Sequence, residues 1–401
     1  EAGQFVNLWA IPLFCCCFMS PYPWLALNLS AIYLVLGIFS PFWGVWLESV
    51  GLQSEQIGLL LGIGFAMRLC GSLVIMRQAK RAERLIPIAR LLVWGGLLCF
   101  AGFYLSSQFW LIFLFTLLVN FVYPTLLPLS DAVAARMVIQ VNLDYGNVRL
   151  WGSAAFIVGA TLIGFVIEHL GPSWILHCIV LFLLLAGFCI HVPMKPAPRT
   201  IGQESETHGY GQLLRNKAFL NFLAIEALIF GSHSAYNSFS AIYWQSQGLA
   251  ASTVSLLWTT GVVFEIIMFA TSRRLLSDWS PERLLCWAAI GAVIRWVTLG
   301  TSLELWLLFP AQALHSFTYT LAHLGAMRYL GQRLPREAII SGQTLYSAIG
   351  QSLSLALFTV LSGILYRHLH QNVFLVMAVI VLPVFYLIWR AKRLESVVAV
   401  K

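Results

Sequence analysis

Five charged side chains lie within stretches that are otherwise apolar: Arg68, Asp131, Glu226, Glu265 and Arg295. A charge inside a membrane is costly unless it faces a partner or a water-filled cavity, so such residues mark functional pathways. Arginine holds carboxylates through paired N–H groups and stays charged. A carboxylate gains or loses a proton as its surroundings change. These residue types favour a polar pathway through a bilayer, and hence transport.

Proton handling is expected from Glu265 and Arg295 together with His315 and His323. The histidines are eight residues apart, about 80° around an α-helix, so both could face one polar cavity. Imidazole also titrates near neutral pH. The alternatives are a static ion pair between Glu265 and Arg295, and buried imidazoles that only satisfy hydrogen bonds.

Arg68 is the candidate for binding an anionic substrate, because a guanidinium holds the anion without competing for the proton. Its alternative is permanent neutralisation by Glu265 across the cavity. Aromatic rings could hold an apolar part of the substrate by stacking. The residues predicted to bind substrate are Arg68, Tyr33, Trp43, Tyr236 and His233.

Asp131 and Arg149 are predicted to belong to a gate near one end of the helices, in a network with Arg136 or Arg328. Substrate contact by Asp131 is the alternative. Glu226 has an open role, because it could also pair with His233, seven residues on along the same helix face.

The composition identifies a membrane protein. The chain of 401 residues is 59% hydrophobic and 10% charged, against roughly 25% charged residues in soluble domains. Its net charge of +8 does not require nucleic acid, because basic residues gather in short loops between apolar segments. No metal-site spacing, phosphate-binding loop or nucleophile signature is present, so no cofactor is expected and an ATP-driven pump is disfavoured.

An apolar helix needs about 20 residues to cross a bilayer, and the sequence predicts an all-α protein with twelve such helices. The expected ranges are 23–47, 55–77, 85–105, 109–135, 147–168, 173–192, 217–241, 252–273, 283–302, 304–330, 338–365 and 371–390. The polar, proline-containing stretch between the sixth and seventh predicts a flexible linker. The expected parts are two six-helix halves, 19–193 and 217–401, joined by a cytoplasmic linker at 194–216.

Residues 1–18 are unlike the remainder. They contain no Lys or Arg before the run Cys15-Cys16-Cys17, and therefore lack the basic region of a signal peptide. We expect this stretch to be non-native or to precede the natural start at Met19. An interfacial N-terminal segment is the alternative.

The basic residues predict the orientation. The loops after the even-numbered spans, with the C-terminal stretch, hold 20 of the 24 Lys and Arg residues, and Arg367 alone lies on the other face. Both termini are therefore expected in the cytoplasm.

The two halves repeat at a spacing of 197 residues. The stretch 42–52 aligns with 239–249, and the same offset aligns Arg68 with Glu265. Halves that repeat in the same direction hold their substrate between them near the midplane. Arg68 and Glu265 are then expected as opposite charges on opposite walls of one cavity.

A signature enters the predicted fifth span, Asp144-Tyr145-Gly146-Asn147-Val148-Arg149-Leu150-Trp151-Gly152-Ser153. It resembles the branch of the major facilitator superfamily that contains lactose and nucleoside permeases, and within it the phenylpropionate permease family. Further likeness lies at 41–43, 57–62, 128–132, 239–245 and 326–329. The resemblance implies a monomer in the bacterial inner membrane that imports an aromatic carboxylic acid with a proton. It also implies a proton-coupling role for the acid, Arg and His set.

Two departures from the family are visible. The loop after the second span has Arg77, Lys80 and Arg81 but no acid at the place where the superfamily has an Asp, so the gating contact of that Asp is in doubt. Glu226 stands where the family is typically apolar.

Other functions remain open. A sugar or nucleoside would need neutral partners such as Asn28, Asn237 and Gln312. A sensor would need a signalling domain, and a channel would need repeated filter elements, and neither is evident. A membrane enzyme is the remaining alternative.

Overall fold

The computed structural model describes residues 18–79, 81–200 and 210–399, and the side chains of these up to residue 391. The expectations for residues 1–17 and 201–209 lie outside this part of the chain. Within it, the long elements are helices, and the only extended pairing is one bridge between Met19 and Met194. The predicted all-α class is confirmed.

The first seven helices follow the apolar stretches. They are α1 Pro21–Ser49, α2 Ser54–Gln78, α3 Ala82–Ala101, α4 Phe109–Val122, α5 Leu126–Val141, α6 Tyr145–Leu170 and α7 Trp174–Cys189. The short 3-10 turn η2, Tyr123–Thr125, joins α4 to α5 within the predicted fourth span. Pro124 lies in this turn and lacks a backbone N–H, which explains the interruption.

The later helices are more often interrupted. They are α8 Tyr210–Leu213, α9 Lys217–Gly231, α10 Ser234–Ser246, α11 Ala251–Leu275, α12 Pro281–Thr301, α13 Leu305–Ala313, α14 Ala322–Arg333, α15 Ile339–Leu345, α16 Ser354–Leu369, α17 Val373–Val381 and α18 Pro383–Ala399. Two π-helical segments, η3 (Ser316–Leu321) and η5 (Tyr346–Leu353), join α13 to α14 and α15 to α16. Such segments are rare and occur often at functional sites.

Nine helical stretches in the described residues are long and apolar enough to cross a membrane. One of them, Arg336–Ala391, covers two predicted spans. The helix α7 has 16 residues, and the predicted span at 304–330 is divided into α13, η3 and α14. Each of the twelve predicted ranges overlaps a helix. The prediction of a multi-span membrane protein is therefore confirmed.

The break between α9 and α10 has a local cause. The side chains of Ser232 and His233 both bond the carbonyl oxygen of Ile229, at 2.7 Å and 2.9 Å. A carbonyl engaged in this way is lost to the helical ladder, and the N–H of His233 donates to Phe230 instead. The bend places His233 at the start of α10, facing the interior.

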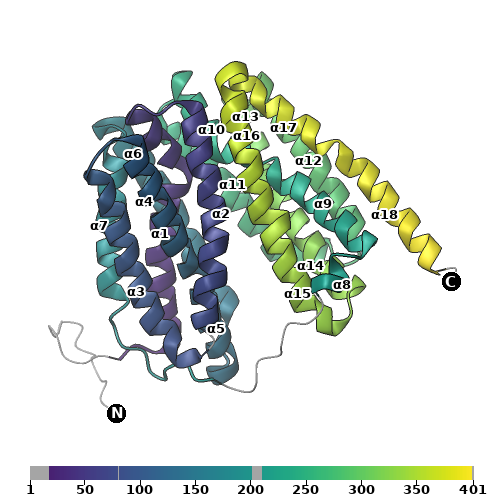
Figure 1. Ribbon diagram of the computed structural model, residues 1–401, viewed down its shortest axis with the longest axis horizontal. Helices are drawn as coiled ribbons and strands as arrows, with labels where there is room; N and C mark the ends of the chain where they lie inside the picture. Colours follow the sequence, from purple (N-terminus) through teal and green to yellow (C-terminus); the bar gives the residue numbers. More distant parts are fainter. Residues whose placement is uncertain (1–17, 80, 201–209, 400–401) are drawn as a thin grey trace, which may run out of the picture.

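The helices gather on two sides of the molecule. In Figure 1, α1–α7 lie on the left and most of α9–α18 on the right, with α10 and α11 in the middle near α2. The sides meet where α2 packs against α16, α6 against α11 and α1 against α10. Gly58 and Gly363 make the first of these contacts possible, because a Cβ at Gly58 would lie 2.6 Å from the Cα of Gly363.

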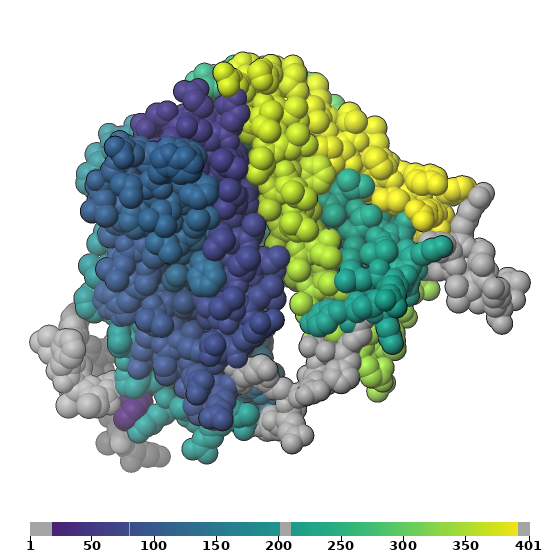
Figure 2. Space-filling view, viewed as in Figure 1, coloured from purple at the N-terminus to yellow at the C-terminus, as the bar shows by residue number. Residues whose placement is uncertain are grey.

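One end of this interface is tightly joined and the other is hollowed. At the end we call the closed end, which holds Glu55, Gly58, Gly363 and Arg367, Nη1 of Arg367 bonds Oε1 of Glu55 at 2.5 Å. At the opposite end, the hollow end, α5 and α15 mark the two sides (Figure 1), and Figure 2 shows a gap between α2 and α15. Among the described residues, the tight contacts between the sides therefore lie at the closed end and the gap lies at the hollow end.

Candidate functional site

Three neighbouring cavities lie between the two sides, with volumes of about 300, 410 and 210 Å³. Arg68 and Leu355 line all three, so the cavities adjoin one another, and we call the three together the central cavity. Its polar lining residues include Tyr33, Arg68, Arg149, His233, Tyr236, Asn237, Glu265, His315 and Tyr319. A pocket of this size with a few convergent polar groups is the expected form of a small-molecule site.

Glu265, His315 and Arg295 form a chain of polar contacts that runs from the cavity wall into the protein. Nε2 of His315 lies 3.3 Å from Oε2 of Glu265, and Nη1 of Arg295 lies 3.1 Å from Nδ1 of His315. A guanidinium can only donate hydrogen bonds, so Nδ1 accepts. The proton of a neutral imidazole then lies on Nε2 and points at Glu265.

Arg295 is buried and held by several contacts, although its Nε has no hydrogen-bond partner among the described residues. It is 0% exposed, and its Nη2 donates to Oε1 of Gln312 at 2.9 Å. The guanidinium also lies 4.3 Å from the ring centre of Tyr236 and 4.8 Å from that of Trp296. Within the described residues it makes no ion pair with Glu265, so the static pair considered from the sequence is replaced by a contact through His315.

Arg68 and Arg149 present two further guanidinium groups to the cavity. No hydrogen bond or ion pair to Arg68 is found in the described part of the chain, including Glu265 across the cavity. Arg149 lies 4.2 Å from the ring centre of Tyr33, and its buried Nη1 has no partner among the described residues. Gly152 makes room for this stack, because a Cβ there would lie 2.8 Å from Tyr33.

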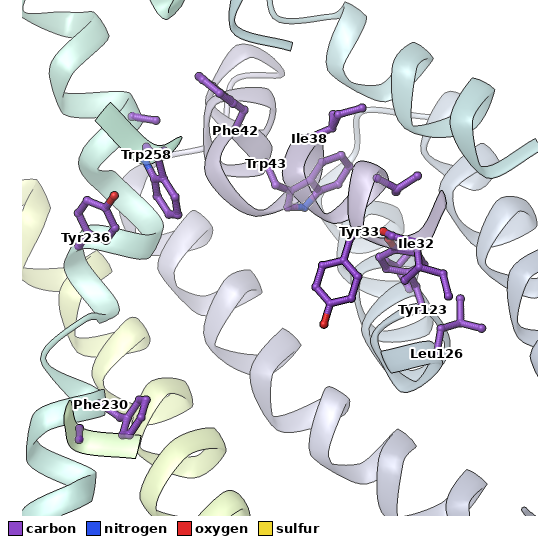
Figure 3. Close-up of a cluster of buried hydrophobic side chains, with 14 of the residues drawn as sticks. Ile32, Tyr33, Ile38, Phe42, Trp43, Tyr123, Leu126, Phe230, Tyr236 and Trp258 are labelled. Carbon is purple, nitrogen blue, oxygen red and sulfur yellow. The ribbon is translucent and has the colours of Figure 1, made fainter. Parts of the chain in front are cut away.

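Aromatic rings form part of the cavity wall. Tyr236 stacks on Trp258 with ring centres 4.6 Å apart, and Figure 3 shows these two side by side while Tyr33 extends from α1 across from them. Trp43 lines the 210 Å³ part of the space and stacks on Trp46 at 4.5 Å. Rings on both sides could hold a planar apolar group.

The histidines do not share one environment. Nδ1 of His233 donates to the carbonyl of Ile229, and its Nε2 lies 2.9 Å from the hydroxyl of Thr318. Nδ1 of His323 lies 3.3 Å from the hydroxyl of Tyr346, and His323 is not among the residues that line the central cavity. The π-helical segment η3 lies between His315 and His323, so the angle expected from α-helical spacing does not apply.

Asp131 lies apart from the charged groups of the cavity. Its Oδ1 accepts a hydrogen bond from the hydroxyl of Tyr145 at 2.5 Å, and no ion pair joins it to Arg149 within the described ranges. Glu226 does not pair with His233 there either, because its two carboxyl oxygens have no described partner.

Tyr319 was missed by the sequence reasoning. Its ring stacks on that of His315 with centres 5.4 Å apart, and it lines the two larger parts of the cavity. The spacing of four residues from His315 was a signal that could have found it. Thr318 was missed as well, although its hydroxyl lies between His233 and Arg295.

Comparisons with known proteins agree with this geometry. The profile of the MFS_1 like family matches residues 22–376. The chain is 40% identical over 366 residues to the "Probable 3-phenylpropionic acid transporter" of Escherichia coli (strain K12), covering 91% of this chain and 96% of that protein. It is 25% identical to the "Maltose permease" of Geobacillus stearothermophilus, over 83% of this chain and 85% of the relative. The solved structure of the nucleoside transporter NupG has a TM-score of 0.77 at 12% identity, covering 94% of this chain and 99% of NupG.

Proposed function

The chain belongs to the MFS_1 like family, and from this premise we propose that it imports an aromatic monocarboxylate, of the 3-phenylpropionate kind, together with a proton. The observation that carries the proposal is the central cavity, where two guanidinium groups and several aromatic rings face a Glu–His–Arg chain. The 40% identical relative, whose name specifies 3-phenylpropionic acid, supports the substrate class.

The proposed architecture has two six-helix halves, residues 19–193 and 217–401, related by a parallel repeat and working as a monomer. The gathering of α1–α7 and α9–α18 on separate sides supports this division (Figure 1). The loops rich in Lys and Arg lie at the hollow end. The positive-inside rule therefore places the hollow end and both termini in the cytoplasm of a bacterial inner-membrane protein. The structure then corresponds to an inward-open state.

The substrate carboxylate is placed between Arg68 and Arg149. Both guanidinium groups line the cavity, and a carboxylate would supply the acceptor that Nη1 of Arg149 lacks. The phenyl ring is placed between Tyr33 and the stacked pair of Tyr236 and Trp258. His233 and Trp43 border this space from α10 and α1.

Glu265 is the proposed proton carrier, and His315 and Arg295 are the groups that position it. A substrate carboxylate in the cavity brings a second negative charge towards Glu265, and like charges favour protonation of one of them. Binding of the anion and binding of the proton would therefore assist each other. This mutual dependence is what couples the two fluxes in a symporter.

Access to the central cavity is proposed to open and close at the two ends of the interface between the sides. The Glu55–Arg367 pair and the Gly58–Gly363 contact hold the closed end in this state. Asp131 and Arg149 are proposed to act in the gate at the hollow end, where Asp131 bonds Tyr145 at the start of α6. His323 is kept as a secondary proton-coupling residue, through its contact with Tyr346.

A sugar or nucleoside is the alternative substrate, and the neutral residues it would need are mostly engaged. Asn28 is buried and donates to the carbonyl of Trp24 in its own helix at 2.9 Å. Gln312 is fully buried against Arg295. Asn237 alone of the three lines the cavity.

Uptake into proteoliposomes tests the proposal. Labelled 3-phenylpropionate, its uncharged amide and a nucleoside would each be offered with and without an inwardly directed proton gradient. We expect gradient-driven accumulation of the acid alone. Accumulation of the nucleoside without that of any aromatic acid would overturn the substrate assignment, and acid uptake indifferent to the gradient would overturn proton coupling.

A further inference from the structure

Glu226 is a buried acid that the proposed cycle does not use. It lies in the middle of α9, is 0% exposed, and neither of its carboxyl oxygens has a hydrogen-bond partner in the described part of the chain. Buried polar groups nearly always have partners, so this exception needs an explanation.

The surroundings of Glu226 are aromatic. Phe222, Glu226 and Phe230 are spaced four residues apart and therefore share one face of α9. Tyr346 of η5 packs on this face, with its ring centre 6.1 Å from that of Phe222 and 6.2 Å from that of Phe230. Gly350 allows the approach, because a Cβ there would lie 3.3 Å from the Cβ of Glu226.

These surroundings select one protonation state. An ionised carboxylate without hydrogen bonds in an apolar site carries a large desolvation cost, whereas the neutral acid carries the much smaller cost of a buried polar group. The neutral acid is therefore the form that fits this structure.

Polar contacts connect the neighbouring Tyr346, although not Glu226 itself, to the central cavity. The hydroxyl of Tyr346 accepts a hydrogen bond from Nε2 of Gln351 at 3.0 Å, and it lies 3.3 Å from Nδ1 of His323. Gln351 lines the 410 Å³ part of the cavity. Both Tyr346 and Gln351 belong to the π-helical segment η5, a type of segment that is frequent at functional sites.

We propose that Glu226 is a second proton-binding site of the transport cycle, and that it exchanges its proton with water in the central cavity past the hydroxyl of Tyr346. The inference rests on the proposed function, because it requires proton-coupled transport. Release breaks the O–H bond of the Glu226 carboxyl, leaves a carboxylate, and passes the proton to cavity water; loading is the reverse. No reactant other than water and the proton is needed.

The groups around the site are compatible with this exchange. The titratable side chains that the packed elements present towards this part of α9 include Tyr346 of η5, and Tyr329 and His323 of α14. α17, which also packs on α9, has no titratable residue. A carboxylate formed at Glu226 would accept from the Tyr346 hydroxyl after a side-chain movement, which gives the charged form a partner in another state of the cycle.

The test counts protons per substrate in proteoliposomes, from dye-reported proton influx and labelled-substrate influx in the same preparation. The variants are Glu226→Gln and, as a matched control, Glu304→Gln at an exposed carboxyl on the N-terminal boundary of α13. We expect two protons per substrate in the wild type and in the control, and one in Glu226→Gln. The same count in Glu226→Gln as in the wild type overturns the proposal.

Two further results keep the test decisive. If Glu226→Gln does not fold, Tyr346→Phe is measured instead, and we expect it to keep the count and to slow substrate-driven proton influx severalfold; an unchanged rate contradicts the proposal. A wild type that moves substrate without any protons would refute the proposed symport itself, which is a different outcome from an unchanged count in Glu226→Gln.

Discussion

At the scale of single residues, the order of Glu265, His315 and Arg295 determines which group contacts the carboxylate. Glu265 meets His315, and His315 meets Arg295, so the carboxylate has a hydrogen-bond donor beside it but no permanent cation in contact. A carboxylate locked to a guanidinium would stay ionised. In the cycle proposed above, the intervening imidazole is the reason why Glu265 is assigned the coupled proton.

Arg68 should control affinity for the anion. We expect Arg68→Gln to raise the KM for 3-phenylpropionate by roughly 10- to 100-fold, because hydrogen bonds to a charged group contribute about 1.5–3 kcal/mol. Initial rates of uptake over a range of concentrations give the KM. The matched control is Arg90→Gln, because Arg90 donates to the carbonyl of Ile190 away from the cavity. An Arg68→Gln protein with wild-type KM would exclude Arg68 from the substrate site.

At the scale of helices, the apolar stretches were sufficient to predict where the elements lie. Each predicted span overlaps a helix, because about 20 apolar residues with satisfied backbone groups have few other options in lipid. The interruptions were not predictable in the same way. The π-helical segment η3 leaves no clear pattern in the sequence, so the α-helical angle used to relate His315 to His323 could not be corrected from the sequence alone.

The candidate site was predicted in part. Arg68 and Glu265 line one cavity, as expected from the spacing of 197 residues between similar stretches of the sequence. The contact of His315 with both Glu265 and Arg295, and the stack of Arg149 on Tyr33, depend on side-chain directions that spacing alone does not fix.

The contact between α2 and α16 depends on the absence of a side chain at Gly58. In Gly58→Ala the added Cβ would lie 2.6 Å from the backbone of Gly363, which cannot move as a flexible side chain can. We expect a loss of about 1–3 kcal/mol in this state, seen as a lower thermal unfolding midpoint and slower uptake. Gly331→Ala in α14 is the control, since a Cβ there meets nothing within 4 Å. Equal unfolding midpoints for the two variants would show that the contact is not tight.

At the scale of the whole molecule, transport requires the closed end and the hollow end to exchange roles. Glu55 and Arg367 join the two sides at the closed end, and the contact of Gly58 with Gly363 lies about one helical turn away. The pair is partly exposed, so its strength depends on ionic strength.

We therefore expect Glu55→Gln to raise the population of states in which the closed end has opened. Distances between spin labels on α2 and α15, in a cysteine-free background, would report a narrower hollow end. The exchange of charges in Glu55→Arg with Arg367→Glu should restore the wild-type distribution. Identical distributions in Glu55→Gln and wild type would mean that the pair does not hold this state.

The central claim is that Glu265 carries a coupled proton. A comparison of substrate exchange with net substrate accumulation tests this claim most directly. Proteoliposomes containing wild type or Glu265→Gln would be assayed for accumulation of labelled 3-phenylpropionate under an inward proton gradient, and for exchange of internal against external substrate without a gradient. The account predicts that Glu265→Gln accumulates far less substrate than the wild type, because only the proton on Glu226 is left to drive uptake, and that it keeps exchange, because a permanently neutral side chain still permits the loaded protein to change state. Gradient-driven accumulation by Glu265→Gln at the wild-type level would contradict it.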